Sequence, residues 1–152
     1  MMFDYIKTQL ETTKHKFWVF YYCWKFCNKL MIRAFKHDFS KYKPYEAKRF
    51  ATTVRKLKGS TYGSEEYKEL LAELKPALDH HYACNRHHPE YHNNGFKDMS
   101  ELDKIEMVLD WLAATRRHTD GDIHKSLKIN QERFQYSNQD RKQLTNIIKE
   151  II

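Results

Sequence analysis

The chain contains 152 residues, with 27 Lys and Arg against 20 Asp and Glu, so its formal net charge is +7. A hydrophobic fraction of 41% and an aromatic fraction of 14% exclude a disordered chain, and the length suits one domain. Four Gly and three Pro are too few for β-sandwiches, barrels or collagen-like repeats, which need turn residues at close intervals. We therefore expect one all-α domain over residues 1–152, built from six or seven helices.

Helical periodicity and cap residues place the expected helices along the chain. Pro44 disfavours a helix through the residue before it and suits the first turn of the next helix. Ser64, Ser137 and Ser100, which stands three residues before Asp103, are N-cap signals. The expected helices cover residues 3–28, 29–41, 44–57, 65–84, 101–118, 122–133 and 138–151.

The first expected helix is rich in aromatic residues and in cations. Apolar side chains cover more than half of its circumference, so we expect a central helix packed on several sides. Six Lys and Arg fall within residues 14–36, and with Trp18, Tyr21, Tyr22 and Trp24 they could bind nucleic acid by phosphate contact and stacking. The alternative is a packed helix with a solvated cationic edge.

The number of Cys residues and the distribution of apolar residues indicate in which cellular compartment the protein is expected. The three Cys make an odd number, so no complete disulfide framework is expected. Cys23 and Cys27 are four residues apart, and a zinc site there is the alternative to reduced thiols. The N-terminus lacks a signal-peptide pattern, and the most apolar stretch, residues 17–35, contains three Lys or Arg, too many for an ordinary membrane span. We expect a cytoplasmic protein without a membrane partner.

Histidine is unusually frequent, with nine residues, and most of them are grouped. His15 lies on the first expected helix, and His37 stands beside Asp38 at the end of the second. A further cluster surrounds the end of the fourth helix and the loop after it: His80, His81, His87, His88, Glu90 and His92. Imidazoles and carboxylates that several helices deliver into one bundle are typical of a metal site.

Carboxylates on a later helix extend this pattern. Asp103, Glu106 and Asp110 are spaced i, i+3 and i+7, so they share one face of the helix. Read alone, such a face is usually solvated. Asp110, however, stands between Val108-Leu109 and Trp111-Leu112, and a carboxylate in an apolar stretch needs a partner.

The order His15, His37-Asp38, His cluster, Asp110 resembles the HD superfamily of metal-dependent phosphohydrolases. The segment of residues 36–41 is similar to the LxHDxGK pattern of that superfamily, with Ser40 in place of Gly. More closely, the chain resembles a family of uncharacterised proteins found in phages and bacteria. Its recurring segments stand here as HDFSKYKPYE (37–46), HHYACNRHHPEYH (80–92), EMVLDWLAAT (106–115) and INQERF (129–134).

The HD resemblance implies a compact HD-like helical domain and a set of metal ligands. A first ion would be held by His15, His37, Asp38 and Asp110, with Asp38 able to bridge two ions. From the second cluster, His81 or its neighbour His80, with one or both of His87 and His88, would hold a second ion or bind phosphate. His81 is favoured, and the alternative role of His80 is a hydrogen bond to a ligand or loop. The ions expected for such mixed ligands are Mn, Fe, Co, Ni or Zn.

Catalytic and substrate-binding roles follow from the same resemblance. Asp38, Lys41, Glu90 and Glu106 are the candidate catalytic residues, and Glu46 is a further candidate for orienting ligands or accepting a proton. Basic residues could bind a substrate phosphate, although cations at helix ends also stabilise the helix dipole. These candidates are Lys41, Arg116, Arg117 and Arg133.

The function we expect is hydrolysis of a nucleotide or another small phosphorylated substrate by metal-activated water. P-loop, zinc-finger, dinucleotide-binding and nucleophile-elbow motifs are not found in the sequence. Two alternatives stay open. One is a non-catalytic, metal-stabilised module that binds nucleotides or nucleic acid; the other is a phage interaction protein on an HD scaffold. A phage-encoded protein would act in the host cytoplasm, and the oligomeric state stays open.

Overall fold

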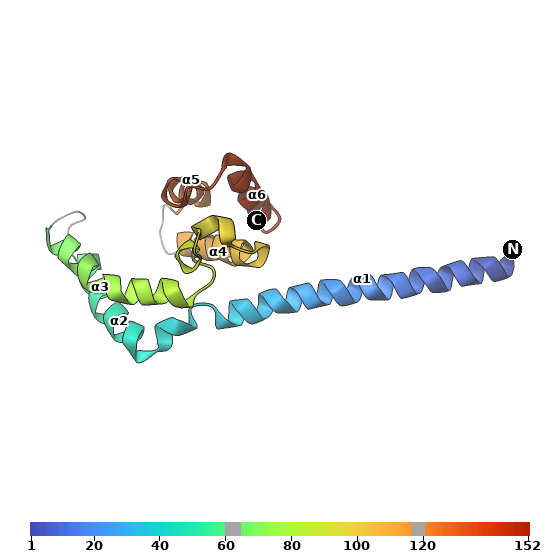
Figure 1. Ribbon diagram of the computed structural model, residues 1–152, viewed down its shortest axis with the longest axis horizontal. Helices are drawn as coiled ribbons and strands as arrows, with labels where there is room; N and C mark the ends of the chain where they lie inside the picture. Colours follow the sequence, from blue (N-terminus) through green and yellow to red (C-terminus); the bar gives the residue numbers. More distant parts are fainter. Residues whose placement is uncertain (60–64, 117–120) are drawn as a thin grey trace. The chain divides into compact units, whose positions relative to one another are not determined.

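The computed structural model describes residues 1–59, 65–116 and 121–152 and has an all-α fold, as the sequence predicted. No strand occurs among these residues. The α-helices are α1 (Met2–Lys36), α2 (Pro44–Gly59), α3 (Glu65–Cys84), α4 (Glu101–Thr115), α5 (Ile123–Phe134) and α6 (Asn138–Lys149); short 3-10 helices are η1 (Phe39–Tyr42), η2 (Pro89–Tyr91) and η3 (Gly95–Asp98) (Figure 1).

The chain forms two compact units, residues 1–36 and residues 37–152. The first unit is α1 alone, and the second contains all the other helices. That residues 1–152 form a single HD-like domain stays a prediction.

Helix α1 is one continuous helix, whereas the sequence predicted two helices that meet between residues 28 and 29. Neither Gly nor Pro occurs in residues 2–36, and Asn28 alone does not break a helix that continues with the strong helix formers Lys29, Leu30 and Met31. No residue of α1 is buried, so the expected packing on several sides is not observed. The predicted end at residue 41 is also wrong, because residues 39–42 form η1.

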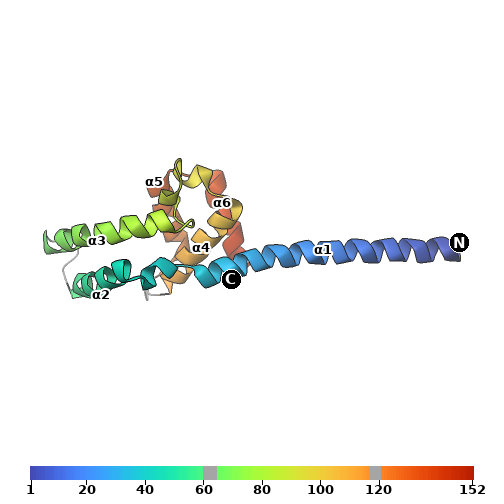
Figure 2. The same cartoon turned by 60° about the horizontal axis from the view of Figure 1, so that its bottom comes forward.

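Helices α2 and α3 lie side by side in both views (Figures 1 and 2). The contact face of α3 repeats at helical spacing, and its buried residues are Leu70, Leu74, Ala77 and His81. The facing side of α2 buries Glu46 and Thr53, both 0% exposed. His81 and Glu46 thus occupy core positions of a helix pair. The expected cap Ser64 lies outside the described residues.

Helices α4, α5 and α6 enclose the main apolar core of the second unit. Its buried side chains are Phe96, Met99, Met107, Val108, Ile123, Leu127, Tyr136, Leu144 and Ile148. The predicted caps are confirmed. Ser100 and Ser137 each accept a backbone N–H three residues later, and Asp103 and Asp140 accept the Ser N–H in return.

Replacing Ser100 by Ala is expected to lower the free energy of unfolding by about 1 kcal/mol, because the first turn of α4 loses its cap. Urea denaturation followed by circular dichroism measures the change. The matched control is Thr52→Ala, which removes an exposed hydroxyl bonded only within α2 and should change stability by less than about 0.5 kcal/mol. Equal effects of the two substitutions would contradict the capping role.

Candidate metal centre

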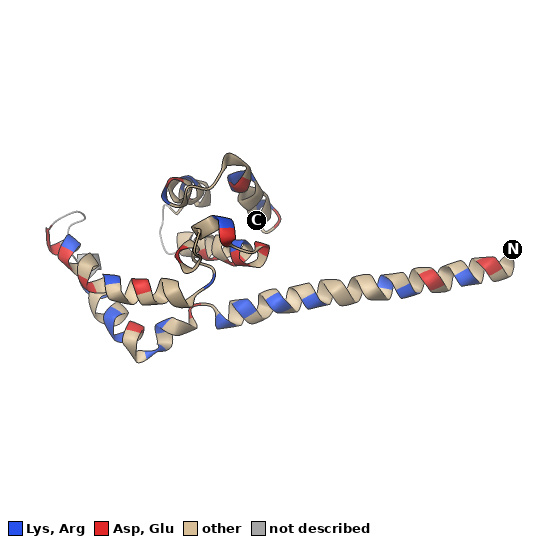
Figure 3. Ribbon diagram, viewed as in Figure 1, with Lys and Arg blue, Asp and Glu red and all other residues tan. Residues whose placement is uncertain are grey.

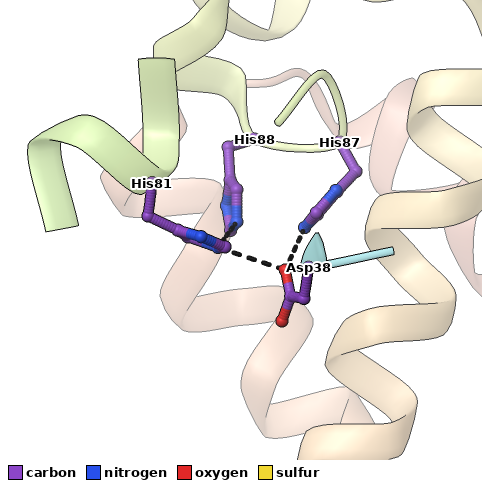
Figure 4. Close-up of side chains that lie close together, drawn as sticks. All are labelled: Asp38, His81, His87 and His88. Atoms are coloured by element: carbon purple, nitrogen blue, oxygen red, sulfur yellow. Dashed lines mark hydrogen bonds and ion pairs between the residues drawn. The ribbon is translucent and has the colours of Figure 1, made fainter. Parts of the chain in front are cut away.

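Four side chains from different parts of the second unit converge on one point: Asp38, His81, His87 and His88 (Figure 4). One ligand atom of each lies within 4.8 Å of the others. Asp38 precedes η1, His81 lies in the last turn of α3, and His87 and His88 stand in the loop between α3 and η2. His81 and His87 are almost fully buried, at 2% exposed each.

The backbone at Asp38 is shaped to aim its carboxylate. Its φ of 55° and ψ of 19° lie in the left-handed region, where Asp and Asn are the residues other than Gly that occur most readily. Although Asp38 occupies the N-cap position of η1, its side chain makes no capping hydrogen bond. The carboxylate faces the imidazoles instead, at the cost of a less favoured backbone conformation.

The separations within this cluster match the edges of a metal coordination shell. Asp38 Oδ1 lies 3.1 Å from His81 Nε2 and 3.4 Å from His87 Nε2, and His88 Nε2 lies 3.0 Å from His81 Nε2. With metal–ligand bonds of about 2.1 Å, neighbouring ligand atoms are about 3.0 Å apart in an octahedral site and about 3.4 Å apart in a tetrahedral one. Three of the six separations therefore match the edges of a coordination shell, and the other three are at most 4.8 Å.

Hydrogen bonding alone leaves part of this cluster unsatisfied. Asp38 Oδ1 and His87 Nε2 are buried and have no hydrogen-bond partner. A buried polar atom without a partner costs free energy, and such atoms often mark a missing ion or water. The cluster therefore fits a cation that the carboxylate and the imidazole lone pairs would share.

A second group adjoins the first through His87. His37 Nε2 lies 3.4 Å from Asp110 Oδ1 and 3.6 Å from Asp38 Oδ2, and its ring is 4.2 Å from that of His87. Asp110 and Glu106 reach these imidazoles from α4. The predicted set His37, Asp38, His81, His87, His88 and Asp110 is thus brought together, with Asp38 between the two groups.

Carboxylates behind the imidazoles decide which ring nitrogen faces Asp38. Glu106 Oε1 lies 3.0 Å from His37 Nδ1 and 3.3 Å from His87 Nδ1. Glu46 Oε2 lies 3.1 Å from His81 Nδ1, and its other oxygen lies 2.6 Å from His80 Nδ1. A carboxylate accepts a proton donated by Nδ1, so Nε2 is the nitrogen of each ring that is placed to bind an ion.

Ser40 completes the support of His81. Its hydroxyl donates to Glu46 Oε2 at 2.9 Å, lies 2.9 Å from His81 Nδ1 and accepts from Asn85 Nδ2 at 2.9 Å. Through these three contacts Ser40 has a structural role in holding His81. Sequence reasoning missed Ser40 and Asn85. The usable signal was their spacing, Ser40 close to Asp38 and Asn85 one helical turn after His81.

Burial and neighbouring charges shift the pKa values of several side chains in the cluster. The carboxylates of Asp110 and Glu106 raise the pKa of His37 to about 10. Burial, followed by the charges of His87 and His81, lowers the pKa of His88 to about 3, so this imidazole is neutral at pH 7. Burial raises the pKa of Asp38, but the neighbouring imidazoles of His81 and His87 and the Lys41 ammonium outweigh it and hold that pKa far below its usual range.

An open cleft with a volume of about 500 Å³ lies beside the cluster. Its walls are formed by His37, Asp38, Lys41, Tyr42, Phe50 and Val54. The Lys41 ammonium pairs with Asp38 Oδ2 and lies 5.7 Å from the centre of the Phe50 ring. Lys41 therefore lies beside the Asp38 carboxylate in the cleft, and its role in binding phosphate stays a prediction.

Other predicted residues that the structure describes are not part of the cluster. His15 is an exposed residue of α1, 21 residues before Lys36, which is about 32 Å along that helix. Arg116 is exposed at the C-cap of α4, and Arg117 lies outside the described residues. Roles for these three in binding metal or substrate stay predictions.

Glu90 and Arg133 pair with each other, with 2.7 Å between Glu90 Oε1 and Arg133 Nη2. They line a separate pocket of about 240 Å³ together with residues of η2 and η3. Their catalytic and substrate-binding roles likewise stay predictions. The third acidic residue on the face of α4, Asp103, caps that helix and pairs with Arg86 at 3.2 Å, so it has a structural role.

A family model matches residues 4–152, which is nearly the whole chain. The chain belongs to the DUF5662 family. This is a family of unknown function, so it brings no reaction with it. No curated protein and no solved structure matches the chain. The chemistry of the centre is therefore argued from its side chains.

Metal binding is expected to release a proton and to strengthen as the pH rises. With a pKa of about 10, His37 carries a proton at neutral pH in the metal-free protein, and an ion bound at Nε2 displaces it. The affinity for Mn²⁺ should rise about tenfold per pH unit between about pH 6 and 8. Calorimetric titration in buffers with different ionisation enthalpies counts the protons. Binding without proton release would contradict this assignment of His37.

Replacing Glu46 by Gln is expected to weaken metal binding by about 10- to 100-fold, because the amide no longer holds His81 with Nε2 toward Asp38. Titration with Zn²⁺ against a competing chelator measures the affinity. Glu69→Gln, which makes the same change at an exposed position of α3, should leave the affinity unchanged. Circular dichroism shows whether both variants keep their helices. An unchanged affinity in a folded Glu46→Gln variant would rule out the orienting role.

Proposed function

We propose that this protein is a metal-dependent phosphohydrolase that acts on a nucleotide or another small phosphorylated molecule. The observation that carries the proposal is the juxtaposition of a buried His/Asp cluster with an open cleft that contains Lys41. The resemblance of the residue order to that of HD phosphohydrolases supports the same reaction.

The ligand set suits a transition metal. Asp38, His81, His87 and His88 would hold one ion, and His37 with Asp110 would hold a second beside it. Imidazole with carboxylate favours Mn, Fe, Co, Ni or Zn over Mg alone. A bound ion would lower the pKa of water towards neutrality and neutralise charge on a phosphate.

Side chains around the ligands would bind the phosphate, exclude water from the substrate and orient the imidazoles. Lys41 presents its ammonium to the cleft and would bind a phosphate oxygen there. Tyr42, Phe50 and Val54 line the same cleft and would exclude water from one side of the substrate. Glu106 faces the Nδ1 atoms of two imidazoles, so its proposed role is to orient them.

A purely structural metal site is the main competing function. Structural sites enclose their ion with protein ligands, whereas catalytic sites keep a coordination position open. His37 and Asp38 line the open cleft as well as the cluster, which favours the catalytic alternative. Two further alternatives are binding of a nucleotide or nucleic acid without turnover, and a phage interaction role. The experiment described below tests both.

The cytoplasm is the compartment that we propose. Cys23, Cys27 and Cys84 are all free thiols, as expected in a reducing environment. Among the described residues, no helix has the length and apolar character needed to cross a membrane.

The test is metal content and turnover on the same samples, with protein prepared without a His tag. The wild type should contain one or two transition-metal equivalents by plasma mass spectrometry and should hydrolyse at least one of a set of nucleotides, cyclic dinucleotides and a generic phosphodiester. Asp38→Asn should lose both, because Asp38 faces both groups of ligands. His124→Gln, an exposed histidine outside the cluster, should lose neither.

Lys41→Met separates substrate binding from metal binding. It should raise KM about tenfold or more with unchanged metal content, since it removes a cation and keeps the length of the side chain. Metal without turnover across the whole substrate set would favour the binding module over the phosphohydrolase. No metal after reconstitution would overturn the proposal.

A further inference from the structure

Helix α1 separates apolar and cationic side chains around its axis. At about 100° per residue, ten apolar residues between 17 and 35 fall within an arc of roughly 180°, whereas Ile32 lies on the cationic side. Five of the six Lys and Arg of residues 14–36 fall within roughly 100° on the other side. The arc contains Phe17, Val19, Phe20, Cys23, Trp24, Phe26, Cys27, Leu30, Met31 and Phe35; the stripe contains Lys14, Lys25, Lys29, Arg33 and Lys36.

The apolar arc is large and exposed. Phe20 is 68% exposed, Trp24 56% and Phe35 87%. An exposed apolar surface of this extent marks an interaction site. The charge beside it identifies the kind of partner, because residues 12–36 contain six Lys and Arg and no Asp or Glu. Figure 3 shows that the acidic residues of α1 lie only near its N-terminus.

Three kinds of partner can be compared on this chemistry. A second copy of α1 could cover the apolar arc but would leave the cationic stripe unused, because residues 12–36 contain no acidic residue to pair with it. Nucleic acid would neutralise the stripe but would leave the aliphatic and Phe side chains of the arc without a function. An anionic lipid surface takes both, with the apolar arc among the acyl chains and the cations at the headgroups.

We propose that residues 14–36 of α1 bind the surface of an anionic phospholipid membrane, with the helix lying in the plane of the interface. Trp18 and Tyr22 stand at the cationic side of the helix, where amphipathic rings fit the headgroup level. This proposal replaces the expectation of no membrane partner, which rested on the cations that interrupt a spanning helix. A helix that lies in the interface uses those cations instead.

The test is sedimentation of the full chain with sucrose-loaded vesicles, either of phosphatidylcholine alone or with about 30% phosphatidylserine. We expect at least tenfold stronger binding to the anionic vesicles. The triple variant Lys14→Gln, Lys25→Gln, Lys29→Gln should weaken that binding about 100-fold, because each cation near an anionic surface contributes about fivefold to the affinity. The matched control Lys125→Gln, Lys128→Gln, Lys142→Gln makes the same change in net charge on exposed residues of α5 and α6 and should leave binding within threefold.

The double variant Phe20→Ser, Trp24→Ser tests the apolar arc and should abolish binding while circular dichroism shows retained helix. Binding that survives this variant, or that falls equally in the two Lys variants, would show non-specific attraction and overturn the proposal. A chain that does not sediment with vesicles would also overturn it. A stable dimer in sedimentation equilibrium that the double variant dissociates would then identify a second copy as the partner.

Discussion

The half-buried carboxylate of Asp38, with its Oδ1 atom buried among imidazoles from two other segments, is the constraint on which the second unit depends. An uncompensated charge at this depth is costly, so the surrounding groups must be positive, donate protons or share a cation with it. His81 and His87 supply the nearest contacts, at 3.1 and 3.4 Å, and Lys41 reaches the other oxygen. The left-handed backbone at Asp38 and the absence of a capping bond from its side chain are consistent with a carboxylate reserved for this site.

Two carboxylates behind the imidazoles orient the rings of the cluster. Glu46 and Glu106 stand behind the imidazoles and accept from Nδ1, so the Nε2 atoms converge on Asp38 rather than point at random. Glu46 comes from α2 and Glu106 from α4, and each is held by packing of its own helix. Because orientation depends on groups one step away from the ligands, the chemistry of the centre is sensitive to substitutions that touch no ligand.

The two units place their apolar residues differently. In residues 37–152 the apolar side chains of α4, α5 and α6 form a core that encloses Met107, Leu127 and Ile148. In α1 they remain exposed beside a row of cations. Burial stabilises a helix by removing apolar surface from water, and an exposed amphipathic helix obtains the same stabilisation only from a partner. We therefore propose separate functions for the two units: the metal centre carries out the reaction, and α1 binds the protein to a membrane surface.

Local signals in the sequence determined the all-α class, the bounds of α3 and the caps at Ser100 and Ser137, because helix propensity and capping act over a few residues. The grouping of His37, Asp38, His81, His87, His88 and Asp110 was also predictable, since these residue types suit one another's chemistry. Only the tertiary structure decided that His81 and not His80 faces Asp38, because that choice follows from which face of α3 packs on α2. It likewise decided that Asp103 pairs with Arg86 while Asp110, on the same face of α4, reaches the centre. Helical periodicity in the sequence shows which residues share one face of a helix. Which other side chains each of those residues contacts depends on how the helices pack, and the sequence alone does not give that packing.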